Sequence, residues 1–362
     1  MNRAKRSILY IFTIIIATQL TGCNYFQNTR TKENLKKVNL KFTEAMALSM
    51  DVNNEKIYSL KDGAILSSGS LSKVQSIDYN IQKKIGVYTK STNNGINLSN
   101  NYVSIDNGGE TYNINKSFSY SDVRLSSSGN YLALRSYKND DIASAEGLGV
   151  YSTNGGKKIE FDKKTIVSGN LYRWGSKDTL LYYGIETSQG TYGKIYEYDF
   201  GSKSRKVAFD KFGGYCMFFL PLGNGDIIYV ENDSNVYNMF YYTKNMEKID
   251  MVTSGIEEIF SSVLDTKNNV IYMLGNDANS SDVALYKYNI ITKKLDRLTY
   301  DFPSIIDKDG GMAIDSFGKV YFCGMSYSKA INSDMYMYDA SKNSVSLITK
   351  TQGNYYIISS GK

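Results

Sequence analysis

After residue 38, short runs in which apolar and polar residues alternate cover most of the chain, a pattern that predicts β-strands. The clearest run is rich in aromatic residues and returns at regular intervals. It appears as IYSL (57–60), YVSI (102–105), GVYS (149–152), IYEY (195–198), FYYT (240–243), LYKY (285–288) and MYMY (335–338). Successive copies start 45 to 50 residues apart, which indicates an internal repeat.

Each aromatic strand belongs to a larger unit. A second strand follows it across a turn such as DNGG or TNGG, and most copies have a further strand upstream, as in SSSGNYLAL (126–134) and GNGDIIYV (223–230). Four antiparallel strands repeated at this spacing are typical of β-propeller blades. We therefore predict an all-β fold for residues 38–362, a β-propeller of seven four-stranded blades, with six or eight blades as alternative counts.

Two other β architectures fit less well. An open β-solenoid favours shorter repeats, and two separate sandwiches would not keep an even period through the middle of the chain. The ends of the repeat region also favour a ring. The first copy lacks an innermost strand and begins with MALSM (46–50), whereas an extra strand, YYIIS (355–359), follows the last copy. We expect this C-terminal strand to complete the first blade and close the ring.

The first 23 residues have the three zones of an export signal. Arg3, Lys5 and Arg6 precede an apolar run at 7–18, which is too short to span a bilayer, and LTGC (20–23) follows. This arrangement resembles the lipobox of bacterial lipoproteins. The resemblance implies cleavage after Gly22, a signal peptide at 1–22 and a diacylglycerol on Cys23, which would anchor the protein to the extracytoplasmic face of the cell membrane.

An ordinary secretory signal, or an anchor helix that happens to contain a cysteine, is the alternative interpretation of this segment. Residues 24–37 are polar, so residues 23–37 are expected to form the lipidated cysteine and a flexible tether. The tether has a net charge of +3, which would favour anionic lipid headgroups, although a plain solvated spacer explains it equally well.

Charge and composition exclude several classes of function. The chain has a net charge of +6, of which the signal peptide and the tether each contribute +3, so residues 38–362 are formally neutral. No basic excess remains for a nucleic-acid partner. The absence of histidine excludes Ser-His-Asp and Cys-His catalysis as well as histidine metal sites, and no cofactor is expected. Cys216 and Cys323 lie in apolar strands and are expected to be buried free thiols, with a disulfide between them as the alternative.

The repeat unit resembles the TolB-like and WD40-like propellers of bacterial envelopes. The match is best where SSSGNYLAL is followed by GVYSTNGGKKIEF, in residues 126–161, and it is loose elsewhere. TolB-like propellers have six blades rather than seven, and the WD dipeptide is absent, so the resemblance implies no particular activity. Residues 104–112 (SIDNGGETY) resemble the Asp-box hairpin of sialidases, which we interpret as a turn stabilised by Asp106 and its glycines.

Candidate binding residues fall in two groups. The first lies on predicted innermost strands and comprises Arg124, Arg173 and Trp174. The second lies on loops and blade-to-blade connections, where rigid scaffolds usually place binding groups, and comprises Asp140, Asp141, Tyr120 and Tyr215. The carboxylates are too sparse for a dedicated calcium loop, so no metal site is expected.

Three hypotheses follow. The first is a non-enzymatic, monomeric surface protein that binds a protein or glycan ligand. The second is a glycan-active hydrolase or lyase that uses arginines, tyrosines and carboxylates in the central channel. The third is an assembly factor for envelope proteins. The first two differ in whether Arg124, Arg173 and nearby acids converge around an open site or pair with one another, for example Arg124 with Asp122.

Overall fold

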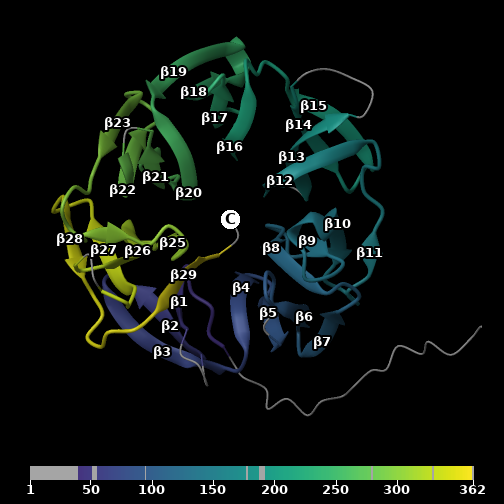
Figure 1. Cartoon of the computed structure of the whole chain (residues 1–362), viewed down its shortest axis with the longest axis horizontal. Helices are drawn as coiled ribbons and strands as arrows, with labels where there is room; N and C mark the ends of the chain where they lie inside the picture. The colour runs from purple at the N-terminus through teal and green to yellow at the C-terminus, as the bar shows by residue number, and fades with distance from the viewer. Residues whose placement is uncertain are drawn as a thin grey trace, which may run out of the picture. The chain divides into compact units, whose positions relative to one another are not determined.

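The computed structural model describes residues 40–50, 55–93, 95–176, 178–186, 192–278, 280–327 and 330–360. Their strands form seven antiparallel sheets, which Figure 1 shows arranged in a circle with the first strand of each sheet toward the centre. The prediction of a seven-bladed propeller is confirmed. The predicted signal peptide, Cys23 and the tether lie outside the described residues.

The blades follow one another along the chain, and each is a meander. Blade 1 contains β29 (Tyr355–Ser359), β1 (Ala45–Ser49), β2 (Glu55–Lys61) and β3 (Ala64–Leu71). Blade 2 contains β4 (Val74–Asn80), β5 (Ile85–Asn93), β6 (Asn100–Asn107) and β7 (Glu110–Ile114). Blade 3 contains β8 (Ser119–Leu125), β9 (Tyr131–Tyr137), β10 (Ala145–Ser152) and β11 (Lys158–Ile159), with the short 3₁₀-helix η1 (Ile142–Ser144) before β10. Blade 4 contains β12 (Thr165–Trp174), β13 (Thr179–Glu186), β14 (Lys194–Asp199) and β15 (Ser204–Phe209).

The remaining blades have the same order, with one departure in the last. Blade 5 contains β16 (Tyr215–Pro221), β17 (Ile227–Asp233), β18 (Val236–Thr243) and β19 (Lys248–Ser254), with η2 (Lys244–Met246) before β19. Blade 6 contains β20 (Ile256–Asp265), β21 (Val270–Asp277), β22 (Ser280–Asn289) and β23 (Lys294–Arg297). Blade 7 contains β24 (Ile305–Ile306), β25 (Met312–Ile314), β26 (Lys319–Met325), β27 (Asp334–Asp339) and β28 (Ser344–Leu347). Its innermost strand is interrupted, because β24 and β25 both pair with β26.

The hydrophobic core lies between the blades. Seven buried clusters among the described residues each join two neighbouring blades, including blade 7 with blade 1. The alternation of side chains along β1 explains how one strand serves two clusters. Ala45 and Ala47 pack toward blade 7, whereas Met46 and Leu48 pack toward blade 2. Each blade therefore buries both of its faces only when the ring is complete.

The C-terminal strand closes the ring as predicted. β29 pairs antiparallel with β1, from Ala45 opposite Ser359 to Ser49 opposite Tyr355. It becomes the innermost strand of blade 1 and contributes Ile357 to one interblade cluster and Ile358 to the next. Blade 1 is thus built from both ends of the repeat region.

The meander gives the ring two different ends. One end, here called the loop face, carries the loops between the second and third strands and the connections between blades. The other, here called the turn face, carries the turns between first and second strands and between third and fourth strands. Within the described ranges, no helix has the length and apolar character needed to cross a membrane.

Candidate functional site

The structure divides the seven predicted binding residues between the two ends of the ring. Arg124 lies next to the last residue of β8, and Arg173 and Trp174 end β12, so these three lie toward the turn face. Tyr120 and Tyr215 stand at the beginnings of β8 and β16, toward the loop face, where Asp140 and Asp141 also lie. The predicted residues therefore do not form one site.

On the loop face, the two aspartates hold loop backbone. The carboxylate of Asp140 accepts hydrogen bonds from the backbone N–H groups of Ile96 (2.6 Å), Asn97 (3.0 Å) and Leu98 (2.6 Å) in blade 2. These bonds lower the pKa of Asp140, with the Leu98 bond contributing most. Asp141 caps η1 by accepting from the N–H of Ala143 at 2.9 Å. Both carboxylates thus already have partners within the protein.

The two loop-face tyrosines differ in exposure. Tyr120 is 2% exposed and packs in the cluster between blades 2 and 3, and its hydroxyl accepts a hydrogen bond from the N–H of Ser117 at 2.8 Å. Tyr215 is 54% exposed and makes an edge contact with Tyr192, with ring centroids 5.5 Å apart. Of the two rings, Tyr215 is the one available to a ligand.

On the turn-face side, Arg124 and Arg173 lie near each other on neighbouring innermost strands, and Trp174 links these two strands. The indole N–H of Trp174 donates to the carbonyl oxygen of Arg124 at 2.8 Å, which ties β12 to β8. Both strands are irregular at this point. In β8 the pairing shifts between Ser121 and Arg124, and Asp122 has a φ of +53°, a left-handed conformation that is uncommon outside glycine. In β12 the pairing shifts between Val167 and Tyr172. Such bulges change the direction of nearby side chains and are frequent next to functional sites.

In the part of the chain that the structure describes, no carboxylate directly contacts the guanidinium of Arg124. Its side chain is exposed, and within the described residues it makes no hydrogen bond or ion pair. Partial loss of solvation beside the innermost strands opposes its charged form, but Tyr356, Asp78, Tyr172 and Asp122 outweigh that effect and raise its pKa. Arg124 is therefore fully charged and still has donors to offer.

The two carboxylates whose charges act on Arg124 have other partners. Asp78 on β4 accepts backbone N–H groups from Tyr79 (2.8 Å) and from Leu125 (2.7 Å). Asp122 accepts the hydroxyl of Ser121 at 2.8 Å and pairs with Arg135 at 3.3 Å. The expected pairing of Arg124 with Asp122 is therefore wrong, because Asp122 pairs with Arg135 of β9 instead. Burial raises the pKa of Asp78 to about 6, against the lowering effect of the Leu125 N–H and of Arg124.

Arg173 adds a second positive charge beside Arg124. Burial, together with the charge of Arg124, lowers its pKa to about 10, so Arg173 stays charged at neutral pH. Its guanidinium donates to the carbonyl oxygens of Tyr172 (2.8 Å) and Asn170 (3.2 Å) and lies 5.8 Å from the ring centroid of Phe218. The carbonyl oxygens that accept its hydrogen bonds are neutral, so its charge remains available to an anion. We call Asp78, Arg124, Arg173 and Tyr356 the axial cluster.

Two members of this cluster were not anticipated from the sequence. Asp78 lies among the apolar positions of VQSIDYN in β4. A carboxylate on an innermost strand is unusual, and this signal could have identified Asp78 as a candidate site residue. Tyr356 comes from β29 and is near Arg124 only because the ring closes. No local pattern around residue 356 points to this placement.

The other predicted features have structural roles. Residues 104–112 form the hairpin of β6 and β7, whose turn glycines, Gly108 and Gly109, have φ values of +64° and +95°. Cys216 and Cys323 are free and buried, in blades 5 and 7. In the part of the chain that the structure describes, no group of three or more carboxylate or thiol side chains could hold a metal ion.

Comparison with known proteins supports the fold. No protein-family model and no curated protein matches this sequence. Among solved structures, the β-propeller domain of the Trilobed protease from Pyrococcus furiosus superposes with a TM-score of 0.54 at 10% identity, covering 85% of this chain and 95% of that one. TolB from Acinetobacter baumannii gives 0.50 at 10% identity, with 88% and 83% covered. A prolyl endopeptidase gives 0.55 at 8% identity and covers 88% of this chain, which spans only 50% of that enzyme.

These likenesses concern the arrangement of strands. The Pyrococcus domain has an open velcro topology, whereas here β29 and β1 join the two ends of the chain in one blade. At such low identity the similarity shows a shared fold and transfers no activity. This chain has a TolB-like β-propeller fold.

Proposed function

We propose that this protein is a membrane-anchored surface lipoprotein that binds the anionic group of a protein or glycan ligand at the axial cluster. The observation that supports binding is the pair of guanidiniums, Arg124 and Arg173, placed together with no carboxylate of the described residues in contact. Arginine side chains present several N–H donors in a plane, and a carboxylate or sulfate accepts two of them at once. Nearby Arg135 is already paired with Asp122, so the local charge favours one further anion.

Anchoring is supported by the sequence of the first 23 residues. Replacement of the lipid-bearing residue, Cys23→Ser, should leave the propeller folded and move the protein from the membrane fraction to the soluble fraction. Metabolic labelling with palmitate should label the wild type and not the variant. Equal membrane retention of both proteins would contradict the lipid anchor.

The binding proposal is tested by affinity capture from gently solubilised membranes with the full-length protein. The variants Arg124→Gln and Arg173→Gln should each lose the captured ligand by at least tenfold, and added salt should weaken wild-type capture because the contact is ionic. Lys267→Gln is the matched control, since it removes one positive charge from an exposed turn on the turn face of blade 6. If Tyr215→Ala lost the ligand while both arginine variants retained it, the binding site would lie on the loop face instead.

A hydrolase or lyase is the second candidate, and one observation favours it. Asp78, whose pKa is raised to about 6, lies near Arg124 and Tyr356, and a carboxyl that exchanges its proton near neutral pH suits acid–base chemistry. Both of its oxygens, however, accept backbone N–H groups. Cleavage of a polysaccharide that disappears in Asp78→Asn, at unchanged binding, would support the enzyme.

A further inference from the structure

The turn face contains a groove between blades 2 and 3, with a volume of about 580 Å³. Four turns frame it, namely those that join β4 to β5, β6 to β7, β8 to β9 and β10 to β11. Its size lies within the range of small-ligand sites, roughly 300–1,000 Å³. The side chains that matter for its chemistry are Lys83, Asn107, Glu110, Tyr112 and Asn154.

The polar groups of the groove combine donors and acceptors with balanced charge. Lys83 supplies one cation and Glu110 one carboxylate, which accepts the hydroxyl of Tyr112. In the described residues, the side chains of Lys83, Asn107 and Asn154 make no hydrogen bond or ion pair. Each amide offers two N–H donors and one acceptor oxygen. The groove is therefore matched to a ligand that is neutral and both gives and accepts hydrogen bonds.

Two tyrosines border the groove, but only Tyr112 has its ring on the groove side, because the Tyr131 ring packs toward blade 4. Tyr131 stacks on Phe200, with ring centroids 4.9 Å apart, and on Trp174 at 6.1 Å. Tyr112 packs against the apolar cluster between blades 2 and 3. The ring of Tyr112 is half-buried, and a rigid ring with a polar tip binds a ligand at a low cost in conformational entropy.

We propose that this groove binds a saccharide of a few sugar units. Sugars are neutral, carry hydroxyls that both donate and accept hydrogen bonds, and have apolar C–H faces that stack on aromatic rings. A phosphate-bearing ligand would need an excess of cations, and here the one lysine is balanced by Glu110. This site extends the proposed function, since it is separate from the axial cluster and takes a different chemical group.

The groove is nonetheless connected to the axial cluster. Tyr131 contacts Trp174, and the indole N–H of Trp174 bonds the carbonyl of Arg124. Tyr131 is therefore the residue that links the border of the groove to the strands that carry the arginines. Separate variants are needed to distinguish the two sites.

The test is a binding screen with the full-length protein against chito-, malto-, cello- and xylo-oligosaccharides of two to six units, followed by calorimetric titration of any that bind. Asn154→Trp fills the groove from an exposed turn, and Glu110→Gln removes its carboxylate. Thr292→Trp is the matched control, because it places the same side chain on the exposed turn between the third and fourth strands of blade 6. Thermal melting of each variant establishes that it is folded.

We expect one oligosaccharide class to bind the wild type and Thr292→Trp equally, and to bind Asn154→Trp and Glu110→Gln at least tenfold more weakly. Arg124→Gln and Arg173→Gln should keep this binding, so failure of the axial proposal and failure of the groove proposal are distinguishable. Absence of binding by every oligosaccharide, binding that the groove variants leave unchanged, or capture in the groove of a short peptide in place of a sugar would each overturn the proposal.

Discussion

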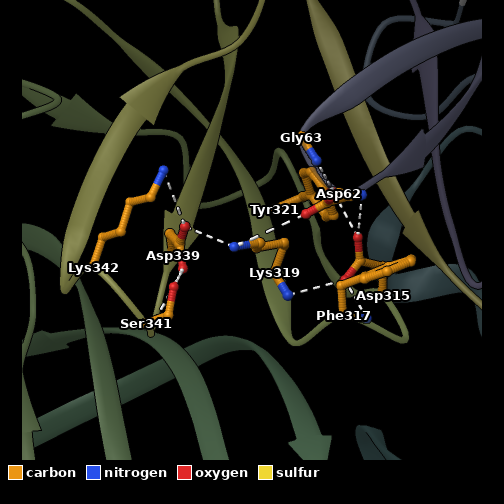
Figure 2. A network of polar contacts seen from close by, with 9 residues as sticks. All are labelled: Asp62, Gly63, Asp315, Phe317, Lys319, Tyr321, Asp339, Ser341 and Lys342. Atoms are coloured by element: carbon orange, nitrogen blue, oxygen red, sulfur yellow. Dashed lines mark hydrogen bonds and ion pairs between the residues drawn. The ribbon is translucent and has the colours of Figure 1, made fainter.

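The backbone N–H of Asp62 donates a hydrogen bond of 2.7 Å to the carboxylate of Asp315, across 253 residues of sequence. The bond joins the hairpin turn of blade 1 to the first turn of blade 7, so it lies at the seam where the ring closes (Figure 2). The hydroxyl of Tyr321 donates to the same carboxylate oxygen (2.8 Å) and accepts the N–H of Gly63 (2.9 Å). Lys319 extends this network to Asp339 at 2.6 Å.

Removing the Asp315 carboxylate should therefore weaken ring closure. Asp315→Ala would leave the N–H groups of Asp62, Phe317 and Lys319 and the Tyr321 hydroxyl without an acceptor, and we expect a loss of about 3 to 4 kcal/mol of unfolding free energy. Urea unfolding followed by the fluorescence of Trp174, the only tryptophan, measures it.

Asp265→Ala is the matched control for this prediction. Asp265 occupies the corresponding first turn of blade 6 and is similarly buried, but among the described residues it accepts bonds only from Lys267 and Asn268, in its own turn. We expect it to cost about 1 to 2 kcal/mol. Equal losses for the two variants would show that the cross-blade bond contributes nothing of its own.

The closing strand itself should be indispensable. Truncation after Asn354 removes β29, uncovers the edge of β1 and takes Ile357 and Ile358 out of two interblade clusters. We expect this chain to lose its cooperative urea transition, whereas Ile358→Ala should stay folded and lose about 3 kcal/mol. Near-ultraviolet circular dichroism and gel filtration distinguish the outcomes, with Ser359→Ala as a control. A truncated chain with native circular dichroism would mean that six complete blades suffice.

Most of the fold could be predicted because each blade repeats the same local pattern. The aromatic third strands, the turns and the two unpaired end strands at 46–50 and 355–359 all have sequence signals that do not depend on distant contacts. The interrupted inner strand of blade 7 has no such sequence signal, because β24 and β25 contain only two and three residues. These are too few to show an alternation of apolar and polar positions.

The sites could be predicted only in part. Arg124 and Arg173 stood out because charged residues interrupt innermost strands, but their proximity depends on bulges and on the packing of β8 beside β12. Nothing around Asp140 indicates that three N–H groups at 96–98 converge on it. The groove was missed because its residues come from four ordinary turns, between Lys83 and Asn154, that meet only in the folded ring.

The loop at 95–98 should depend on Asp140 for its order. Asp140→Ala removes all three hydrogen bonds to its backbone, so amide hydrogen exchange at Ile96, Asn97 and Leu98 should become faster while the strands of blades 2 and 3 keep their protection. Asp141→Ala is the control, since it frees the N–H of Ala143 instead. Unchanged exchange at 96–98 in Asp140→Ala would contradict the contact.

Stability should depend on pH through Asp78. Burial raises its pKa from 3.8 to about 6, so the folded protein binds this proton more tightly than the unfolded chain does. The folded state is therefore favoured by Asp78 at low pH, and this contribution falls as the pH rises from about 4 through about 6. Asn resembles the protonated carboxyl and does not titrate. We expect Asp78→Asn to match the wild type near pH 4 and to become more stable than it by up to about 3 kcal/mol at pH 7.5.

Asp339→Asn tests the sign of this effect. Several contacts, of which the hydrogen bond from Lys319 is the largest, hold the pKa of Asp339 well below its usual range. The ionised Asp339 therefore stabilises the folded state above pH 4, and this stabilisation is lost only below pH 4. Between pH 4.5 and 7.5, Asp339→Asn should stay less stable than the wild type by a constant amount, while the difference for Asp78→Asn grows. Parallel urea titrations at these pH values measure both. If the stability difference between Asp78→Asn and the wild type were also constant, Asp78 would already be ionised at pH 4.5 in the folded protein. Arg124 would then stabilise the Asp78 carboxylate more than burial destabilises it.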